Sequence, residues 1–368
     1  MSHDADYRSD LPDGAAMASQ IKRWGEALGF DQVGISDIDL AEYEPKLKAW
    51  LDAGLHGEME WMARHGDKRS HPEKLVPNTR SVIVVRMDYL PANATPVQDL
   101  LDRPERACIS RYALGRDYHK VLRKRLQALA EQVEDWIGPF GYRVFTDSAP
   151  VLEKPLAEKA GLGWIGKHTN LLNRQAGSWF FLGEIYTDLQ LPADAPVTDH
   201  CGSCRRCMDV CPTQAIIAPY QLDATRCISY LTIELKGSIP EPFRKPMGNR
   251  IYGCDDCQMV CPWNRYAQFS AEDDFQPRKD LDSGELTDLF SWDETEFLAR
   301  TEGSAIRRIG HERWLRNIAV ALGNAPTSPG VVNALKSRLD HPSMLVREHV
   351  EWALKQHTPG PSNHAADS

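Results

Sequence analysis

Two short cysteine runs constrain this chain more than any other feature of its sequence. The first run is CGSCRRCMDVCP, beginning at Cys201, and the second is CDDCQMVCP, beginning at Cys254. The first has the spacing C-x2-C-x2-C-x3-C-P, in which three thiolates bind one four-iron cluster and the fourth binds a second cluster. A structural zinc site needs only two C-x2-C pairs. The spacing therefore predicts two linked iron–sulfur clusters.

The second run is one cysteine short of this template. Superposition of the runs leaves Ile251 in the place of the first cysteine, and Cys227 stands alone between the runs. Two four-iron clusters need eight thiolates, so we assign Cys227 as the eighth ligand. The predicted ligands of the first cluster are Cys201, Cys204, Cys207 and Cys261, and those of the second are Cys211, Cys227, Cys254 and Cys257. A single cluster with half of the cysteines structural is the alternative, which the doubled C-P signature disfavours.

Length and composition indicate a protein of the cytoplasm. The chain has 368 residues, which predicts two or three domains, and its formal net charge is -9. It has no secretory or twin-arginine signal and no apolar run near the ~18 residues that span a bilayer, so we expect no membrane association. Eight of nine cysteines lie between residues 201 and 261, which favours metal binding over disulfides in such a chain.

The secondary-structure pattern predicts an α+β fold in several parts. Mixed strands and helices between residues 20 and 190 indicate a mixed α/β first domain. The hydrophobic pattern after the cysteine runs is that of helices. We expect strands at 31–36, 81–87, 107–112 and 142–148, a strand pair with a short turn over 170–189, and the longest helix near 117–138. The expected domains are a disordered N-terminus at 1–15, an α/β domain at 16–190, a ferredoxin-like double-cluster domain at 191–270, a helical region at 271–357 and a disordered tail at 358–368.

The C-terminal helices allow two interpretations. The segments 314–325 and 344–354 share an apolar-Arg start and an Ala-Leu end, with VVNALKSRL between them. A HEAT-type helical repeat would give this pattern, and so would an ordinary helical pair. Both interpretations stay open.

Several residues outside the cysteine runs are candidates for a site. Asp147 ends the predicted strand at 142–148, where open sheets present side chains to ligands, but it or Ser148 could instead cap the helix that follows. The segment 103–125 has eight Lys or Arg against two acids, which indicates either a phosphate-binding face or a solvated helix face. GLGWIG at 161–166 follows a predicted helix rather than a strand, so it fails as a dinucleotide motif.

In combination, these motifs resemble the epoxyqueuosine reductase family. They are the double-cluster runs with Cys227 inserted, RYALGRDYHK, TDSAP, EKPLAEKAGLGWIGKHTNLL, YLTIELKGSIP and RNIAVALGNA, and the resemblance runs from about Ile21 to about Lys355. This family removes the epoxide oxygen of epoxyqueuosine at the wobble position of tRNA, a reduction by two electrons and two protons.

The resemblance implies the cofactors and the roles of several residues. It implies cobalamin in the first domain, two 4Fe-4S clusters in the second, a HEAT-like part that helps to hold the anticodon stem-loop, and Asp147 as general acid and cobalamin neighbour. Cobalamin contacts are expected at Cys108, Ser229 and Asp255, although a lone cysteine such as Cys108 is commonly a small buried hydrophobe. tRNA contacts are expected at Lys236, Arg111, Arg116 and Arg313, the last in a basic group with Arg307, Arg308 and Arg316.

Two other functions remain as alternatives at this stage. One is a cobalamin and iron–sulfur reductase of a small organic substrate, similar to reductive dehalogenases. The other is an electron-transfer protein that feeds a partner. The absence of a D-x-H-x-x-G motif agrees with a corrinoid that has no lower histidine ligand. We expect a monomer that receives electrons from an external donor, which the sequence does not identify.

Overall fold

An antiparallel sheet forms the centre of the N-terminal half of the chain. The computed structural model describes residues 12–279 and 281–358, and its main sheet has the strand order β1-β2-β7-β4. These strands span Gln32–Ser36, Ser81–Asp88, Phe180–Thr187 and Tyr142–Phe145. All neighbouring pairs are antiparallel, so this part of the predicted mixed α/β domain is of the α+β class rather than a parallel doubly wound sheet.

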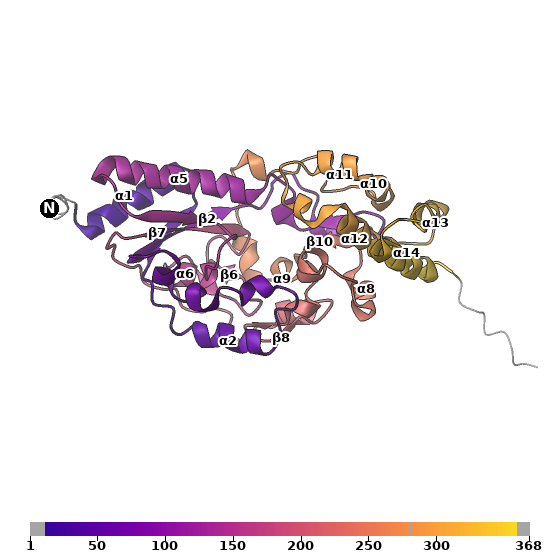
Figure 1. Cartoon of the computed structure of the whole chain (residues 1–368), viewed down its shortest axis with the longest axis horizontal. Helices are drawn as coiled ribbons and strands as arrows, with labels where there is room; N and C mark the ends of the chain where they lie inside the picture. Colours follow the sequence, from indigo (N-terminus) through magenta and orange to yellow (C-terminus); the bar gives the residue numbers. More distant parts are fainter. Residues whose placement is uncertain (1–11, 280, 359–368) are drawn as a thin grey trace, which may run out of the picture.

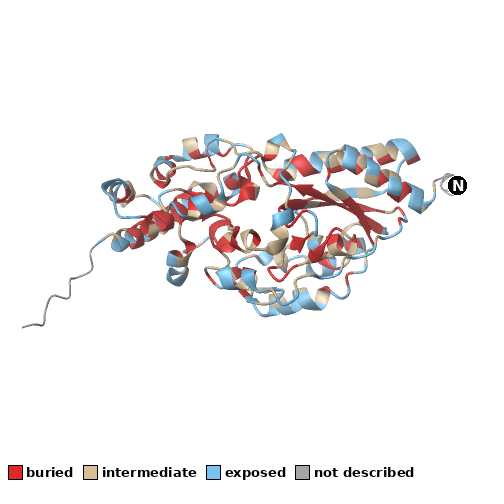
Figure 2. Ribbon diagram, turned by 180° about the vertical axis from the view of Figure 1, so that it is seen from behind, coloured by how far each residue is buried: buried red, intermediate tan, exposed pale blue. Residues whose placement is uncertain are grey.

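Helices cover both faces of this sheet (Figure 1). α1 (Gly14–Ala27) and α5 (Tyr118–Ile137) pack on one face, and α6 (Glu153–Lys159) packs on the other. Figure 2 shows the strands buried between helices whose outer faces are exposed. β2 is buried along its whole length, as the apolar run SVIVV predicts for a strand covered on both faces. The longest helix, α5, lies where the apolar stripe at 117–138 predicted it.

The strand pair expected over residues 170–189 does not form. β6 (Leu171–Leu172) pairs with β5 (Trp164–Ile165), whereas β7 pairs with β2 and β4. β7 is eight residues long and almost entirely buried, so its apolar surface is covered in the middle of the sheet rather than at the edge of a hairpin. A bridge between Asn173 and Gly177 marks the short turn.

The cysteine region consists of short elements. α7 (Arg206–Val210) and α9 (Asp256–Met259) each contain one cysteine of a run, Cys207 and Cys257, and pack against each other. Between them the chain forms the hairpin β8 (Ile216–Ala218) and β9 (Gln221–Leu222), the π-helical segment η6 (Tyr230–Glu234), α8 (Glu241–Met247) and β10 (Arg250–Tyr252). Three further short helices, α2 (Glu44–Asp52), α3 (Pro72–Leu75) and α4 (Val97–Leu101), belong to the N-terminal half.

A second hydrophobic core joins the cysteine region to the C-terminal helices. These helices are α10 (Leu286–Ser291), α11 (Glu294–Arg300), α12 (Gly310–Asn324), α13 (Pro329–Lys336) and α14 (Met344–Gln356). The core contains residues from 224–252 and 281–353, so packing crosses the expected boundary at residue 270. β3 (Cys108–Ile109) also joins it by pairing parallel with β10, and this strand is shorter than the one expected at 107–112.

Helices occupy all three C-terminal segments that were predicted to be helical. α12 packs against both α13 and α14, and the HEAT-type interpretation of this packing stays a prediction. The segments expected to be disordered, 1–15 and 358–368, lie largely outside the described residues. Helix α1 begins at Gly14, inside the first of them, and Asp13 caps it by accepting hydrogen bonds from Ala15 and Ala16. In the described ranges, no helix has the length and apolar character needed to span a bilayer.

One buried arginine ties the C-terminal helices to the cysteine region. Arg316 on α12 is fully buried, and its guanidinium donates to the backbone carbonyls of Leu231, Leu235 and Gly237, each at 2.7 Å. The next residue, Asn317, donates to carbonyls in η6 and β10 at 2.9 Å. Because a π-helical turn and its exit leave carbonyls that regular structure does not satisfy, these donors hold the segment that follows Cys227.

We expect Arg316→Met to lower the free energy of unfolding by about 3–5 kcal/mol, because buried carbonyls would lose a charged donor that nothing else replaces. Denaturant unfolding followed by tryptophan fluorescence measures this loss. The matched control is Arg300→Met on α11, where an exposed pair with Glu296 should contribute less than about 1 kcal/mol. Equal effects of the two substitutions would contradict this role of Arg316.

An acidic residue occupies the centre of the main sheet. Glu184 on β7 is fully buried, and neither of its carboxyl oxygens has a hydrogen-bond partner among the described residues. Burial raises the pKa of Glu184 well above its ordinary value, and the nearby carboxyl of Glu153 raises that pKa further. The folded chain therefore binds a proton at Glu184 that the unfolded chain releases at a lower pH.

The stability of the protein should consequently fall as the pH rises above the unfolded glutamate pKa of about 4.3 and passes through the raised folded pKa of Glu184. We expect Glu184→Gln to remove part of this dependence, because glutamine carries no proton to lose. Between pH 6 and pH 9 the variant should therefore lose less stability than the wild type. Thermal unfolding at pH 6 and pH 9 provides the measurement, and parallel pH profiles for the two chains would contradict it.

Candidate functional site

The eight clustered cysteines line two separate cavities. Around the first cavity, of about 230 Å³, lie Cys201, Cys204, Cys207 and Cys261. The second cavity, of about 410 Å³, has Cys211, Cys227, Cys254 and Cys257 among its lining residues. We call these sets the first and second cysteine groups. Each group combines thiols from different runs, and the same two sets of four were predicted from the ligand exchange.

The local fold explains how each run reaches both cavities. Cys207 lies within α7 and points to the first group, whereas Cys211 ends that helix just before Pro212 and lines the second cavity. Cys257 lies within α9 and lines the second cavity. Cys261 follows that helix, just before Pro262, and lines the first cavity. Proline cannot continue a helix, so each run turns at its last cysteine. The turn sends the last thiol of each run to the other group.

The thiols of each group are close enough to affect one another electrostatically. Burial raises the pKa of Cys207 to about 11, and the neighbouring thiols of Cys261, Cys201 and Cys204 contribute to this rise. In the second group, burial raises the pKa of Cys257, with Cys227 the next largest cause. Bound metal ions would reverse this effect by stabilising the thiolates.

The arrangement fits a cluster better than a single ion. All nine cysteines are free thiols, and within residues 12–279 and 281–358 no three His, Cys, Asp or Glu side chains converge on a point that could hold one metal ion. The thiols instead border spaces of the sizes given above. His168, which lines both cavities, is buried and its Nε2 has no hydrogen-bond partner in the described chain. A group bound in either cavity could satisfy this nitrogen.

Asp147 lies where three cavities meet. It lines the second cysteine cavity, a cavity of about 460 Å³ beside α6, and a groove of about 850 Å³ that we call the basic groove. Its backbone has a φ of 43°, a left-handed conformation that non-glycine residues rarely adopt outside functional sites and turns. The Asp147 side chain is 56% exposed, and the hydroxyl of Tyr118 donates a hydrogen bond to its carboxylate.

The alternative role of Asp147 as a helix cap is not observed. Helix α6 begins at Glu153, later than the expected start near Pro150, and its first turn has no side-chain cap. The backbone N–H of Asp147 instead donates to the carboxylate of Glu153. Ser148 accepts from Arg123 at 3.1 Å. The strand end therefore presents the carboxylate of Asp147 to the cavities.

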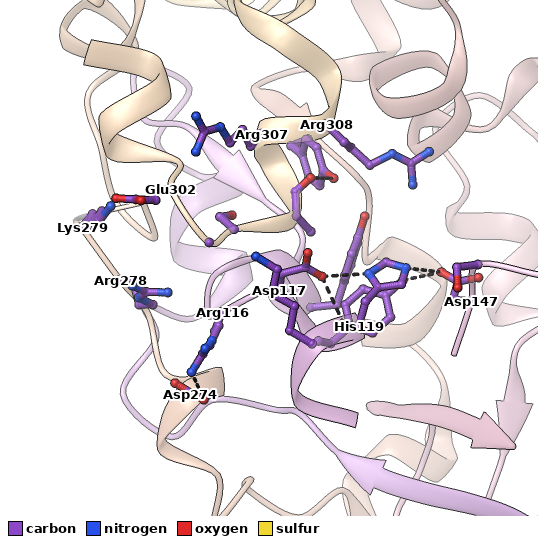
Figure 3. A pocket seen from close by; sticks show the side chains of 18 residues that line it. Arg116, Asp117, His119, Asp147, Asp274, Arg278, Lys279, Glu302, Arg307 and Arg308 are labelled. Carbon is purple, nitrogen blue, oxygen red and sulfur yellow. Dashed lines mark hydrogen bonds and ion pairs between the residues drawn. The ribbon is translucent and has the colours of Figure 1, made fainter. Parts of the chain in front are cut away.

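A histidine and a second aspartate extend the polar group around Asp147 (Figure 3). The Nδ1 atom of His119 lies 2.8 Å from Asp117, and its Nε2 atom lies 4.0 Å from the Asp147 carboxylate. Tyr118 is held between aromatic rings, stacked on Phe181 and on His119 with centroids 4.1 Å apart in each pair. The residues that begin an incomplete D-x-H-x-x-G pattern thus position Asp147.

Glu153 connects this group to the buried acid of the sheet. Burial raises the pKa of Glu153 to about 8, and the charge of Asp147 is the next cause of that rise. Glu184 lies beside it. Lys154, the neighbour of Glu153 on α6, lines both the second cysteine cavity and the cavity beside α6. Two carboxyl groups with raised pKa values therefore lie next to Asp147.

The basic groove carries a local excess of positive charge in an acidic chain. Its charged lining residues, in the part of the chain that the structure describes, comprise six cations and four carboxylates: Arg116, Lys120, Arg278, Lys279, Arg307 and Arg308, with Asp117, Asp147, Asp274 and Glu302. Figure 3 shows Arg307 and Arg308 on one side of the groove and Arg116, Arg278 and Lys279 on another. Sequence reasoning missed Arg278 and Lys279, because an isolated Arg-Lys pair carries no signal before the fold brings it to the groove.

The other residues expected to contact tRNA have different positions. Arg111 is only 3% exposed, its backbone and side chain bond to Asp255 and Thr95, and it does not line the basic groove, so its contact with tRNA stays a prediction. Arg313 uses its guanidinium on the carbonyls of three residues, and Lys236 is exposed but lines none of the cavities described above. Arg316 is buried in the core, as described for the fold. Of the expected cations, Arg116, Arg307 and Arg308 line the basic groove.

Of the residues expected to contact cobalamin, some line the second cysteine cavity and others do not. Ser229 lines the second cysteine cavity, at the start of η6. Asp255 is buried, its carboxylate accepts from Ser110 and from the backbone of Arg111, and it does not itself line the second cysteine cavity, although Ser110 does. Cys108 is buried in β3 and lines none of the cavities described. Burial raises the pKa of Cys108 to about 12, as for a buried small hydrophobe.

Comparisons with known proteins agree with both halves of this site. The family model "Epoxyqueuosine reductase QueG, DUF1730" matches residues 69–148, and the model "4Fe-4S double cluster binding domain" matches residues 200–264. The first match includes Asp147, and the second includes all eight clustered cysteines. These matches cover the two regions in which the sequence motifs were found.

Relatives of known identity match nearly the whole chain. An epoxyqueuosine reductase of Pseudomonas aeruginosa is 61% identical over 347 residues, which cover 94% of this chain and 96% of the relative. The structure of an epoxyqueuosine reductase from Bacillus subtilis, described with its catalytic aspartate loop swung out of the active site, has a TM-score of 0.84 at 27% identity and covers 94% of this chain and 91% of its own. An epoxyqueuosine reductase with an epoxyqueuosine-modified tRNA-Tyr stem loop shares the fold at 24% identity, with a TM-score of 0.80 and coverage of 93% and 99%. The chain belongs to the epoxyqueuosine reductase family.

Proposed function

We propose that this protein reduces epoxyqueuosine to queuosine at the wobble position of tRNA, using cobalamin and two 4Fe-4S clusters, with Asp147 as the proton donor. The observation that carries this proposal is the position of Asp147. Its carboxylate lies where the basic groove meets the cavity of the second cysteine group. A polyanionic substrate and a source of electrons can therefore reach the same acid.

The basic groove favours an RNA substrate over a small organic molecule. Its six cations lie around one opening, and phosphate contacts of this kind give RNA affinity that falls with salt. Tyr112 and His119 line the same groove, and an unstacked loop base can stack on the face of the His119 ring that Tyr118 does not cover. A pure electron carrier would need neither the groove nor the acid at its end.

The second cysteine cavity suits a corrinoid beside a cluster. Aromatic residues such as Tyr89, Tyr112 and Phe181 form part of its wall, and Ser229 and Gln258 add polar groups. This mixture matches a flat ring with an apolar face and amide groups at its edge. When bound, cobalamin would supply a reduced cobalt centre for the two-electron reduction, and the clusters would supply single electrons.

The residues around Asp147 provide the protons of the reaction. Removal of the epoxide oxygen as water needs two protons, and a protonated Asp147 gives the first to the opening epoxide oxygen. The Tyr118 hydroxyl fixes the position of the carboxylate. His119, held by Asp117, lies 4.0 Å from Asp147, so a water molecule between them would be needed to return a proton to the carboxylate. The same carboxyl group can then donate the second proton.

Anaerobic reconstitution tests the proposed function directly. The purified chain is supplied with iron, sulfide, cobalamin and a reductant, and is then incubated with tRNA that carries epoxyqueuosine. Mass spectrometry of the digested tRNA should show conversion of epoxyqueuosine to queuosine. We further propose that the active form is a monomer and that it works in the cytoplasm. Conversion without cobalamin, or none with a fully loaded chain, would contradict the proposal.

Asp147→Asn should lower the rate of epoxyqueuosine turnover by about 10²- to 10⁴-fold, because an amide cannot donate the proton that a carboxylic acid gives. The absorption of the clusters and of bound cobalamin should stay as in the wild type. Nucleoside mass spectrometry and visible spectra measure both properties. The control is Asp52→Asn on α2, an exposed change of the same chemistry away from the site, and wild-type turnover in Asp147→Asn would refute the acid role.

Cys227→Ala should lower the bound iron by up to half, because it removes one thiolate of the second cysteine group and leaves the first group complete. Iron analysis and electron paramagnetic resonance of the reconstituted protein measure the loss. The matched control is Cys108→Ala, which removes a buried thiol outside both groups and should keep both clusters. Full iron content in Cys227→Ala would show that this cysteine is not a ligand.

A further inference from the structure

We propose that a groove beside the first cysteine group is the docking site of a small acidic protein that delivers single electrons. This inference rests on the proposed function, which needs an electron donor. The groove has a volume of about 820 Å³, and its lining includes Trp179, Arg206, Val210, Met259 and Arg265. We call it the donor groove.

The donor groove and the first cysteine cavity share a wall. Arg206, Cys261, Pro262 and Arg265 line both spaces. A carrier seated in the groove would therefore lie against the residues that surround the first cluster. Electron tunnelling slows steeply with distance, so an external donor would transfer electrons fastest to the first cluster from this shared wall. The second cysteine group faces Asp147 and Tyr118 instead.

The donor groove is separate from the surface proposed for tRNA. None of its described lining residues lines the three cavities that meet at Asp147. A donor and a tRNA can therefore bind to different parts of the surface. Electrons would enter at the first cysteine group and leave from the second, without release of the substrate between the two electron transfers.

The charge of the donor groove specifies an acidic partner. Arg206 is exposed and forms no ion pair in the described chain, and Arg265 is exposed and lies over the ring of Tyr266, 4.6 Å from its centroid. Asp209, the carboxylate of the groove, is compensated by Arg205 at 3.6 Å. The whole chain has a net charge of -9, which repels an acidic carrier at long range. A local positive patch directs such a carrier to this one place.

The apolar residues at the groove fit a short-lived complex. Val210 lines the groove and is 36% exposed, and Tyr266, which lies under the guanidinium of the lining residue Arg265, is 38% exposed. Complexes of redox proteins bury little surface and depend on charge for their association rate. A small apolar area with a basic rim is the arrangement that such a partner requires.

The test measures cluster reduction by reduced flavodoxin, an acidic one-electron carrier, in the absence of tRNA. Stopped-flow absorbance of the reconstituted protein should give a rate about tenfold lower for the double variant Arg206→Glu, Arg265→Glu than for the wild type at low ionic strength. Added salt should slow the wild type and have little effect on the variant. Reduction by a small uncharged one-electron reductant should be equal in both, because such a reductant needs neither a docking surface nor a complementary charge.

The matched control reverses two exposed cations far from the groove, Arg23→Glu on α1 and Lys336→Glu on α13, and should keep the wild-type rate with flavodoxin. The proposal is overturned if the groove variant reacts with flavodoxin as fast as the wild type, or if the control is slowed equally. Because the readout is cluster absorbance, these outcomes are independent of epoxide turnover. A chain that holds no clusters would overturn the proposed function and this inference together.

Discussion

The exchange of one thiol between two cysteine runs is the constraint on which this structure depends. Cys261 must reach the cavity of the first run and Cys211 the cavity of the second, so α7 and α9 have to pack together before either set of four is complete. The remaining thiol, Cys227, comes from a third place in the sequence. Its position depends on η6, which the side chains of Arg316 and Asn317 hold from the distant helix α12. The C-terminal helices are therefore part of the support of the cluster site rather than an added domain.

The same packing explains why domain boundaries drawn along the sequence do not describe the cores. The strand β3 follows the N-terminal segments in sequence, but it pairs with β10 and joins the second core. Helix α5 then leads back to the sheet, and its first residues, Tyr118 and His119, surround Asp147. Two segments of the chain thus cross between the halves at the place where the cavities meet. A site at such a junction can combine residues that neither half could supply alone.

The sequence predicted the parts of this site that depend on local spacing. The cysteine runs have a spacing that only a few structures require, and Asp147 follows a strand with a clear pattern, so both could be identified without coordinates. Residues whose position depends on tertiary packing could not be identified in this way. Arg111 and Arg116 are five residues apart in one basic segment, yet Arg111 is buried against Thr95 and Asp255 whereas Arg116 lines the groove. A charge count cannot distinguish them, because the difference arises from the turn that follows β3.

Two separate cationic patches explain how an acidic protein could bind two anionic partners. Two acidic surfaces repel, and this chain is acidic overall, so its partners are selected where cations gather: at the basic groove beside Asp147 and at the donor groove beside Cys261. Both proposed partners, an RNA and an acidic electron carrier, are anionic, and a single continuous basic surface would let each compete for the site of the other. The two patches share no lining residue, and this separation avoids the competition. In the proposed scheme it also orders the flow of electrons, since the donor groove adjoins only the first group and the basic groove meets only the cavity of the second.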